Sequence, residues 1–248
     1  LLRVHVSDAP LERIEFERAL LAHAVERDPG LRGALQSAAG GARPGEVEFD
    51  GAHVPVTLLE WLPGRPMIEL ERVPQQLLHE AGALLGRIDR ALASFPERSA
   101  PTPTPPGPGV SWDLAQAPEV GARHADAIES EAQRALFERV LARGGPAVAA
   151  AAERSPSQVI HQDANDSNLL VGAADENAYD VQVAGLIGSG DATWAPRAFD
   201  PAIGAAYAAL RRRDPLGGIA RFLAGFQEEC ALTNDALALV FDLARLRL

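Results

Sequence analysis

The chain of 248 residues contains no lysine, only one cysteine and no long apolar run. A single cysteine, Cys230, excludes a disulfide framework and a cysteine-built zinc site, so we expect a reducing compartment and a cytoplasmic protein. No stretch approaches the roughly eighteen uninterrupted apolar residues of a membrane-spanning helix, and the first residues lack the basic-then-apolar layout of a secretory signal. We therefore expect no membrane insertion. Cys230 has no basic neighbour and is predicted to be a small core residue.

Acidic residues outnumber basic ones, 34 against 23, and every basic residue is an arginine, which gives a formal charge of −11. This balance argues against a nucleic-acid partner, because phosphate-backbone binding needs a concentrated basic surface. An acidic surface could attract an amine-bearing substrate, or it could serve solubility alone. The apolar share of 47% and the charged share of 23% are ordinary for a globular chain with one large core or two lobes.

Polar residues cluster at the ends of short apolar runs in the second half of the chain. His161, Gln162 and Asp163 follow one run, and a second run ends at Gly188 and leads to Asp191. Such β-branched runs are typical of buried strands that deliver side chains to a cleft. Asp163 and Asn168 stand five positions apart across a tight loop. A carboxylate and an amide oxygen so placed suit phosphoryl transfer, in which the first handles a hydroxyl proton and the second holds a phosphate-bridging magnesium ion.

This order of residues resembles the aminoglycoside-phosphotransferase and hydroxylysine-kinase family, relatives of the protein kinases, with its pattern H-G-D-x-x-x-x-N, a strand ending I-D-x-G, and an Asp opening a helix. The resemblance implies an α+β, two-lobed protein-kinase-like fold. Its partial, nucleotide-binding N-lobe would cover residues 1–62, and its mostly helical C-lobe, with the catalytic loop and substrate-binding helices, residues 63–248. It runs through nearly the whole chain, at His161, Asp163, Asn168, Asp200 and the stretches 58–64, 83–89, 112–114 and 242–247.

The resemblance implies a phosphotransferase that uses ATP or GTP and Mg²⁺ on a small-molecule hydroxyl. Family members have two further strands before the position of Leu1, so we expect a fragment or one domain of a longer polypeptide. In the implied site, Asp163 is the base and Asn168 a magnesium ligand. Arg3 contacts a phosphate and has Glu17 as its partner, and Glu60, Trp61 and Leu62 form a hinge that holds a purine edge. His161 is the buried support of the loop, and Asp200 is both the anchor of the loop and a helix N-cap.

Three residues depart from the family pattern, and they keep a second function open. Gln162 replaces a glycine, Arg3 replaces a lysine, and Gly188 replaces the metal-binding Asp. Asp191, three residues after Gly188, could supply the missing carboxylate or could be only a polar turn residue. The alternative function is a catalytically inactive kinase-like domain that binds a ligand or regulates a neighbouring domain.

Two narrower alternatives also follow from the residues. His161, Asp163 and Asp191 could form a metal-hydrolase site, although no H-x-H or H-E-x-x-H pattern accompanies them. Trp61 could be the buried residue of an ordinary turn instead of part of a hinge.

The hydrophobic spacing and the turn residues predict the elements between these motifs. We expect a strand over 1–6, a turn over 7–10, a helix over 11–26, strands over 47–49 and 53–59 around an Asp50-Gly51 turn, a helix over 74–92, an extended proline-rich loop over 101–109, and helices over 129–143, 146–154, 202–212, 216–230 and 235–248.

Overall fold

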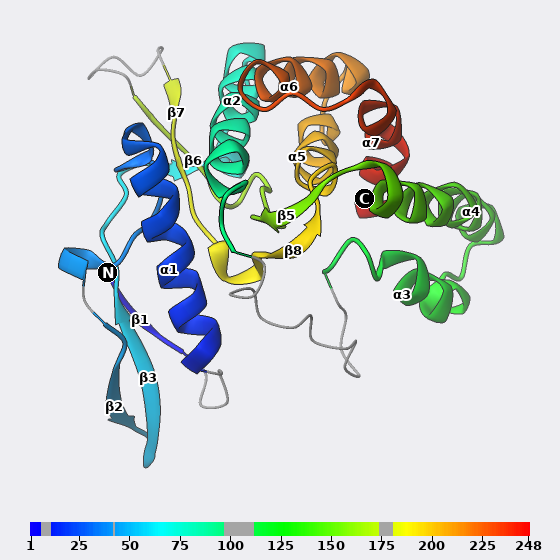
Figure 1. Cartoon of the computed structure of the whole chain (residues 1–248). Coiled ribbons are helices and arrows are strands. Elements are labelled where there is room, and N and C mark those ends of the chain that lie inside the picture. The colour runs from blue at the N-terminus through cyan, green and yellow to red at the C-terminus, as the bar shows by residue number, and fades with distance from the viewer. Residues whose placement is uncertain (6–10, 42, 97–111, 174–180) are drawn as a thin grey trace.

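The computed structural model describes residues 1–5, 11–41, 43–96, 112–173 and 181–248, and within them the chain has the expected α+β architecture (Figure 1). Its first sheet has the order β1-β3-β2 and is antiparallel throughout. Asp50 and Gly51 both have positive φ values, 51° and 76°, as a tight hairpin turn requires. The elements are β1 (Leu2–Val4), α1 (Leu11–Arg27), β2 (Gly45–Phe49) and β3 (Ala52–Leu58).

Two small sheets frame the loop that carries Asp163. One sheet has the order β4-β6-β7, and the other pairs β5 with β8, a strand that the sequence did not predict. The loop therefore leaves one sheet at the end of β5 and enters the other at the start of β6. These strands are β4 (Arg65–Pro66), β5 (Ser157–Ile160), β6 (Leu169–Ala173), β7 (Val181–Leu186) and β8 (Thr193–Pro196).

The longer helices form most of the second half of the fold, and Figure 1 shows α4 to α7 on the side away from α1. They are α2 (Gln75–Leu92), α3 (Ala117–His124), α4 (Glu131–Arg154), α5 (Phe199–Ala209), α6 (Pro215–Glu229) and α7 (Asn234–Arg247). Short 3₁₀ turns include η1 (Pro29–Leu31), η2 (Ala39–Gly41), η3 (Met67–Glu69), η5 (Ala125–Ala127) and η6 (Ser189–Asp191).

The prediction of two helices over 129–143 and 146–154 is wrong, because α4 continues through Pro146. Proline removes one helical hydrogen bond, but packing against α7 can override this local preference. Gly144 supplies that contact, since a Cβ atom there would lie within 3.1 Å of three atoms of Leu246. The sequence also gave no expectation of α3. The expected turn over 7–10 and the loop over 101–109 lie outside the described residues.

Helix α6 packs almost backbone to backbone on α2. A Cβ atom at Gly82 would collide with the carbonyl oxygen of Phe222, and one at Gly225 would collide with that of His79. The Phe222 ring in turn fills the space beside Gly204 of α5. The three helices thus share one tightly packed core, in which Phe199, Phe222 and Phe226 are fully buried. Cys230 is buried as expected, but the expectation that it has no basic neighbour is wrong, because the fold brings Arg197 to it. Among the described residues, every helix is too short or too polar to span a bilayer.

Candidate functional site

Asp200 anchors the loop between β5 and β6 through hydrogen bonds to its backbone. Its two carboxylate oxygens accept hydrogen bonds of 2.7 Å from the backbone N–H groups of His161 and Gln162. Asp200 is fully buried, so these bonds are shielded from water. The expectation that Asp200 is also an N-cap is wrong, because α5 begins at Phe199 and its N-cap is Ala198. The anchoring contact therefore comes from within the first turn of the helix.

Gln162 adopts the backbone conformation that glycine favours. Its φ value is +70°, in the left-handed region, where a side chain adds strain. The side chain is held by a 2.8 Å hydrogen bond from Nε2 to Oδ1 of Asp113. The loop thus keeps a left-handed residue at the family's glycine position, with this contact and the Asp200 bond to hold it there.

His161 is buried beneath the loop and contacts its backbone. The ring atom Nδ1 accepts a hydrogen bond of 3.3 Å from the N–H of Asp163. This geometry suits support of the loop, because the ring is directed at the peptide chain that carries Asp163.

The Asp163 carboxylate, 18% exposed, accepts hydrogen bonds from three side chains. Oδ1 accepts from Nδ2 of Asn165 at 2.9 Å and from Nη2 of Arg247 at 2.8 Å. Oδ2 accepts from Nδ2 of Asn168 at 2.7 Å. The structure therefore brings Asp163 and Asn168 together as the sequence indicated, and it adds a cation that the sequence did not.

Arg247, in the last turn of α7, is the residue that sequence reasoning missed. Its side chain is 6% exposed and lies against the rings of Trp112 and Tyr207, with its guanidinium carbon 5.6 and 5.9 Å from the ring centroids. A second bond, from Nη1 to the carbonyl oxygen of Trp112, is 2.6 Å long. The stretch 242–247 belongs to the family resemblance, but no local pattern marks this arginine as a partner of Asp163.

Gly188 has a left-handed backbone, which glycine adopts freely, and its surroundings are crowded. Its φ is +86°, and a Cβ atom built on it would lie 2.6 to 2.9 Å from the amide atoms of Asn168. The Nδ2 group of Asn168 donates to the backbone and side chain of Asp163. The amide oxygen of Asn168 is therefore the polar atom of this side chain that remains able to bind a ligand. An Asp at position 188 could not occupy this backbone without displacing Asn168.

Asp191 lies in the turn that follows Gly188. Burial, and then the negative charge of Asp163, raise the pKa of Asp191, while Arg13, His161 and Arg247 oppose the shift. The two carboxylates therefore share one electrostatic environment. Among the described residues, no group of three His, Cys, Asp or Glu side chains lies so that it could hold a metal ion.

The basic residue expected to contact phosphate is tied to the same turn. Nη1 of Arg3 donates to both carboxylate oxygens of Glu17 at 2.9 Å. Oγ of Ser189, a residue that the sequence analysis passed over, donates to Oε1 of Glu17 at 2.8 Å. Arg13 adds a hydrogen bond of 2.9 Å from Nε to the carbonyl oxygen of Gly190. Strand β1 and helix α1 are thereby linked to the residues that follow Gly188.

The segment expected to be a hinge joins β3 to β4. Its Glu60 N–H donates to the carbonyl oxygen of Ser37 at 2.9 Å, and Leu62 is buried. Trp61 is 70% exposed, so the alternative of a turn with a buried Trp is wrong. A purine contact by Glu60, Trp61 and Leu62 stays a prediction.

A second carboxyl group, Asp89 of α2, is fully buried beside Asp200. Desolvation is the largest cause that raises the pKa of Asp89 well above its ordinary value, and the charge of Asp200 adds to it. Arg197 opposes the shift. Asp200, which anchors the loop, therefore lies in a buried pair of carboxyl groups with Asp89.

Comparison with known proteins adds the following findings. A model described as the phosphotransferase enzyme family matches residues 1–245. Hydroxylysine kinase of Bos taurus is 28% identical over 182 residues, which cover 72% of this chain and 47% of that protein. The chain thus spans about half the length of this relative.

Two solved structures match the fold. A microcompartment-associated aminopropanol kinase superimposes with a TM-score of 0.66 at 20% identity, over 99% of this chain and 74% of its own. An aminoglycoside phosphotransferase from Streptomyces rimosus, solved with ADP and streptomycin, gives a TM-score of 0.54 at 20% identity, over 100% and 86% of the two chains. At these identities the likeness establishes the fold alone, and it is the kinase-like fold expected from the sequence.

Proposed function

Because the chain belongs to the phosphotransferase enzyme family, as its motifs predicted, we propose that it is an ATP- or GTP-dependent phosphotransferase acting on a hydroxyl of a small, amine-bearing molecule. The observation that carries this proposal is the meeting of Asp163 and Asn168 beside the turn after Gly188. Residues 1–62 would form the nucleotide-binding lobe and residues 63–248 the lobe with the catalytic loop.

Each residue has a defined task in this reaction. Asp163 would accept the proton of the acceptor hydroxyl. That hydroxyl has to compete with the guanidinium of Arg247 for the Asp163 carboxylate. Arg3, oriented by Glu17, would contact a nucleotide phosphate, for which a planar guanidinium offers paired donors. The backbone of residues 60–62 would hold the purine. His161 and Asp200 would keep Asp163 in position.

Asn168, just before β6, and Asp191, in the turn after β7, fit a magnesium ion in part. Asn168 would hold it through its amide oxygen and Asp191 through its carboxylate, which are oxygen ligands of the kind that Mg²⁺ takes. A cation there would also lower the cost of keeping Asp191 ionised near Asp163. When bound, the ion neutralises phosphate charge.

The acceptor class is supported by the names of the similar proteins. Hydroxylysine, aminopropanol and the aminoglycoside streptomycin all combine a hydroxyl group with a basic nitrogen. The acidic balance of this chain suits such cations. The single cysteine, Cys230, also supports a cytoplasmic location as part of this proposal.

A second candidate function is a catalytically inactive domain that binds a ligand or regulates a neighbour. Gly188 offers no metal-binding carboxylate, and its Cβ space is taken by Asn168. Both oxygens of Asp163 already accept hydrogen bonds from within the chain. These two features favour a site that holds a nucleotide without transferring its phosphate.

Calorimetric titration with ATP and with GTP, each with and without magnesium, distinguishes the two functions. The phosphotransferase is expected to bind nucleotide more tightly with magnesium, and Asp191→Asn should abolish that gain. The protein should then transfer labelled γ-phosphate to hydroxylysine, aminopropanol or streptomycin. Magnesium-independent binding without transfer to any of the three would favour the inactive domain instead.

A further inference from the structure

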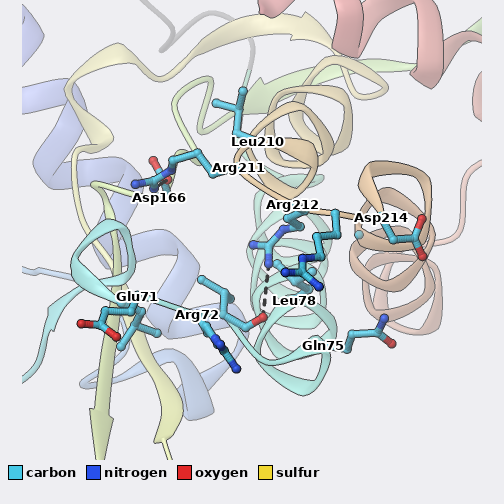
Figure 2. A pocket seen from close by; sticks show the side chains of 13 residues that line it. Glu71, Arg72, Gln75, Leu78, Asp166, Leu210, Arg211, Arg212 and Asp214 are labelled. Atoms are coloured by element: carbon cyan, nitrogen blue, oxygen red, sulfur yellow. Dashed lines mark hydrogen bonds and ion pairs between the residues drawn. The ribbon is translucent and has the colours of Figure 1, made fainter.

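A cavity of about 510 Å³ lies outside the site described above and shares only Asp166 with its loop (Figure 2). This volume falls within the range of about 300–1,000 Å³ that is usual for small-molecule sites. The cavity is enclosed by the segment before α2, the first turns of α2, the α5–α6 connection and the start of α6. Its lining residues are Leu70, Glu71, Arg72, Val73, Gln75, Leu78, Asp166, Leu210, Arg211, Arg212, Arg213, Asp214 and Gly218.

Four of these residues are arginines, and the nearby carboxylates neutralise only one of them. Asp166 pairs with Arg211 at 2.6 Å. Asp214 caps α6 through a 2.9 Å hydrogen bond from the N–H of Gly217. Figure 2 shows the carboxylates of Glu71 and Asp214 pointing to opposite sides of the view, away from Arg212. Within the described ranges, no ion pair involves Arg72, Arg212 or Arg213, and the four arginines and three acids of the lining give it a formal charge of +1 in a chain of net charge −11.

Arg212 is fixed in place before any ligand arrives. Its Nε donates to the carbonyl oxygen of Ala208 and its Nη1 to that of Val73, the second bond being 3.2 Å long. Gly218 leaves room for its stem, since a Cβ atom there would lie 3.0 Å from Cδ of Arg212. Burial lowers the pKa of Arg212; Asp166 opposes this shift and the charge of Arg211 adds to it. A guanidinium held rigidly and short of negative charge is a preorganised anion donor.

We propose that these four arginines, Arg72, Arg211, Arg212 and Arg213, form an arginine pocket that binds a small phosphate-bearing anion. Guanidinium groups present paired N–H donors that match phosphate oxygens. Three guanidinium groups without an ion pair offer several N–H donors to one ligand, which the oxygens of a phosphate can use more fully than those of a single carboxylate. Because Arg211 also holds Asp166, the bound anion would lie one side chain from the loop that carries Asp163. This inference does not depend on phosphoryl transfer by the chain.

Inorganic pyrophosphate is the probe, measured by calorimetry at low salt. The double variant Arg72→Gln/Arg213→Gln removes two guanidinium groups that make no ion pair within the described residues, so the fold should persist. We expect its affinity for pyrophosphate to fall by about tenfold or more, the effect of losing a charge-assisted hydrogen bond. The matched control is Arg139→Gln/Arg154→Gln, which makes the same change of charge at two exposed arginines of α4 and should bind like the wild type.

A third variant separates the arginine pocket from the proposed nucleotide site. Arg3→Gln should weaken nucleotide binding and leave pyrophosphate binding to the arginine pocket unchanged. In the wild type, pyrophosphate should slow hydrogen–deuterium exchange in residues 70–73 and 210–214. The inference is overturned if wild-type affinity is weaker than about 1 mM, if the control variant loses affinity as much as the pocket variant, or if exchange slows only near Arg3.

Discussion

Arg247, in the last turn of α7, donates a 2.8 Å hydrogen bond to Asp163, 84 positions earlier in the chain. Both side chains are largely shielded from water, so each supplies the charge that the other needs. The guanidinium is also held against Trp112 and Tyr207. The residue proposed as base is thus positioned by the C-terminal helix as well as by its own loop.

Arg247→Gln is expected to lower the free energy of unfolding by about 3 kcal/mol, because it leaves the Asp163 carboxylate without its buried partner. Urea denaturation measures the change. Arg245→Gln is the control on the same helix, where the Asp242 pair is more exposed and should contribute less than about 1 kcal/mol. A double-mutant cycle with Asp163→Asn isolates the pair. A coupling energy near zero would show that the contact does not form in solution.

Gly188→Asp, which restores the family's metal-binding residue, is expected to destabilise the protein without a gain in phosphoryl transfer. The left-handed backbone and the contact with Asn168 together should cost about 1–3 kcal/mol. Thermal unfolding and a transfer assay check both parts. Gly190→Ala is the control, because a Cβ atom there meets nothing within 4 Å. A stable Gly188→Asp variant with increased transfer would mean that Asn168 turns aside readily.

Asp163→Ala should reduce phosphoryl transfer more than His161→Ala does. The first change removes the group that handles the proton, a contribution of about 10² to 10⁴-fold, and the second removes only support for the loop. Rates are compared after circular dichroism confirms equal folding. Equal and small losses in the two variants would show that transfer does not use this loop.

Asp89→Asn should flatten the dependence of stability on pH. Since burial and Asp200 raise the pKa of Asp89, the folded protein holds a proton that the unfolded chain releases above about pH 4. Stability contributed by Asp89 therefore falls as pH rises from that value toward the folded-state pKa. The variant removes this loss, so its gain over the wild type should grow with pH. Urea denaturation at a series of pH values upward from about 4, the ordinary pKa of an aspartate, measures the slope. The exposed Asp126→Asn variant should leave the slope unchanged.

Local patterns were enough to predict the elements whose stability is local. The Asp50-Gly51 turn and the apolar stripe of α2 were predicted from neighbouring residues alone, and both are confirmed. Strand β8 could not be predicted in this way, because it is short, ends in Pro196 and exists through its pairing with β5. The same limit applies to α4, which continues through Pro146 and packs through Gly144 against Leu246 of α7.

The candidate site also combines contacts that the sequence motif predicts with long-range contacts that it does not. Asp163 and Asn168 stand five positions apart, and Gly188 ends the next strand of the same family pattern, so their meeting could be expected from the motif. Two contacts that complete the site come from far along the chain. Arg247 of α7 binds Asp163, and Glu17 of α1, which was expected only as the partner of Arg3, also accepts a hydrogen bond from Ser189. The sequence also showed that Gly188 lacks a carboxylate, but it could not show that Asn168 fills the space that a side chain would need.

The close packing of α6 on α2 also affects the position of α5 and of the loop that carries Asp163. The backbone of Phe222 contacts Gly82 of α2, and its ring contacts Gly204 of α5. The first turn of α5 carries Asp200, which accepts hydrogen bonds from the backbone of the loop. A side chain at position 82 would push α6 outward and so shift the carboxylate under His161. A single methyl group at position 82, which touches no ligand, would therefore be enough to disturb the geometry of the loop.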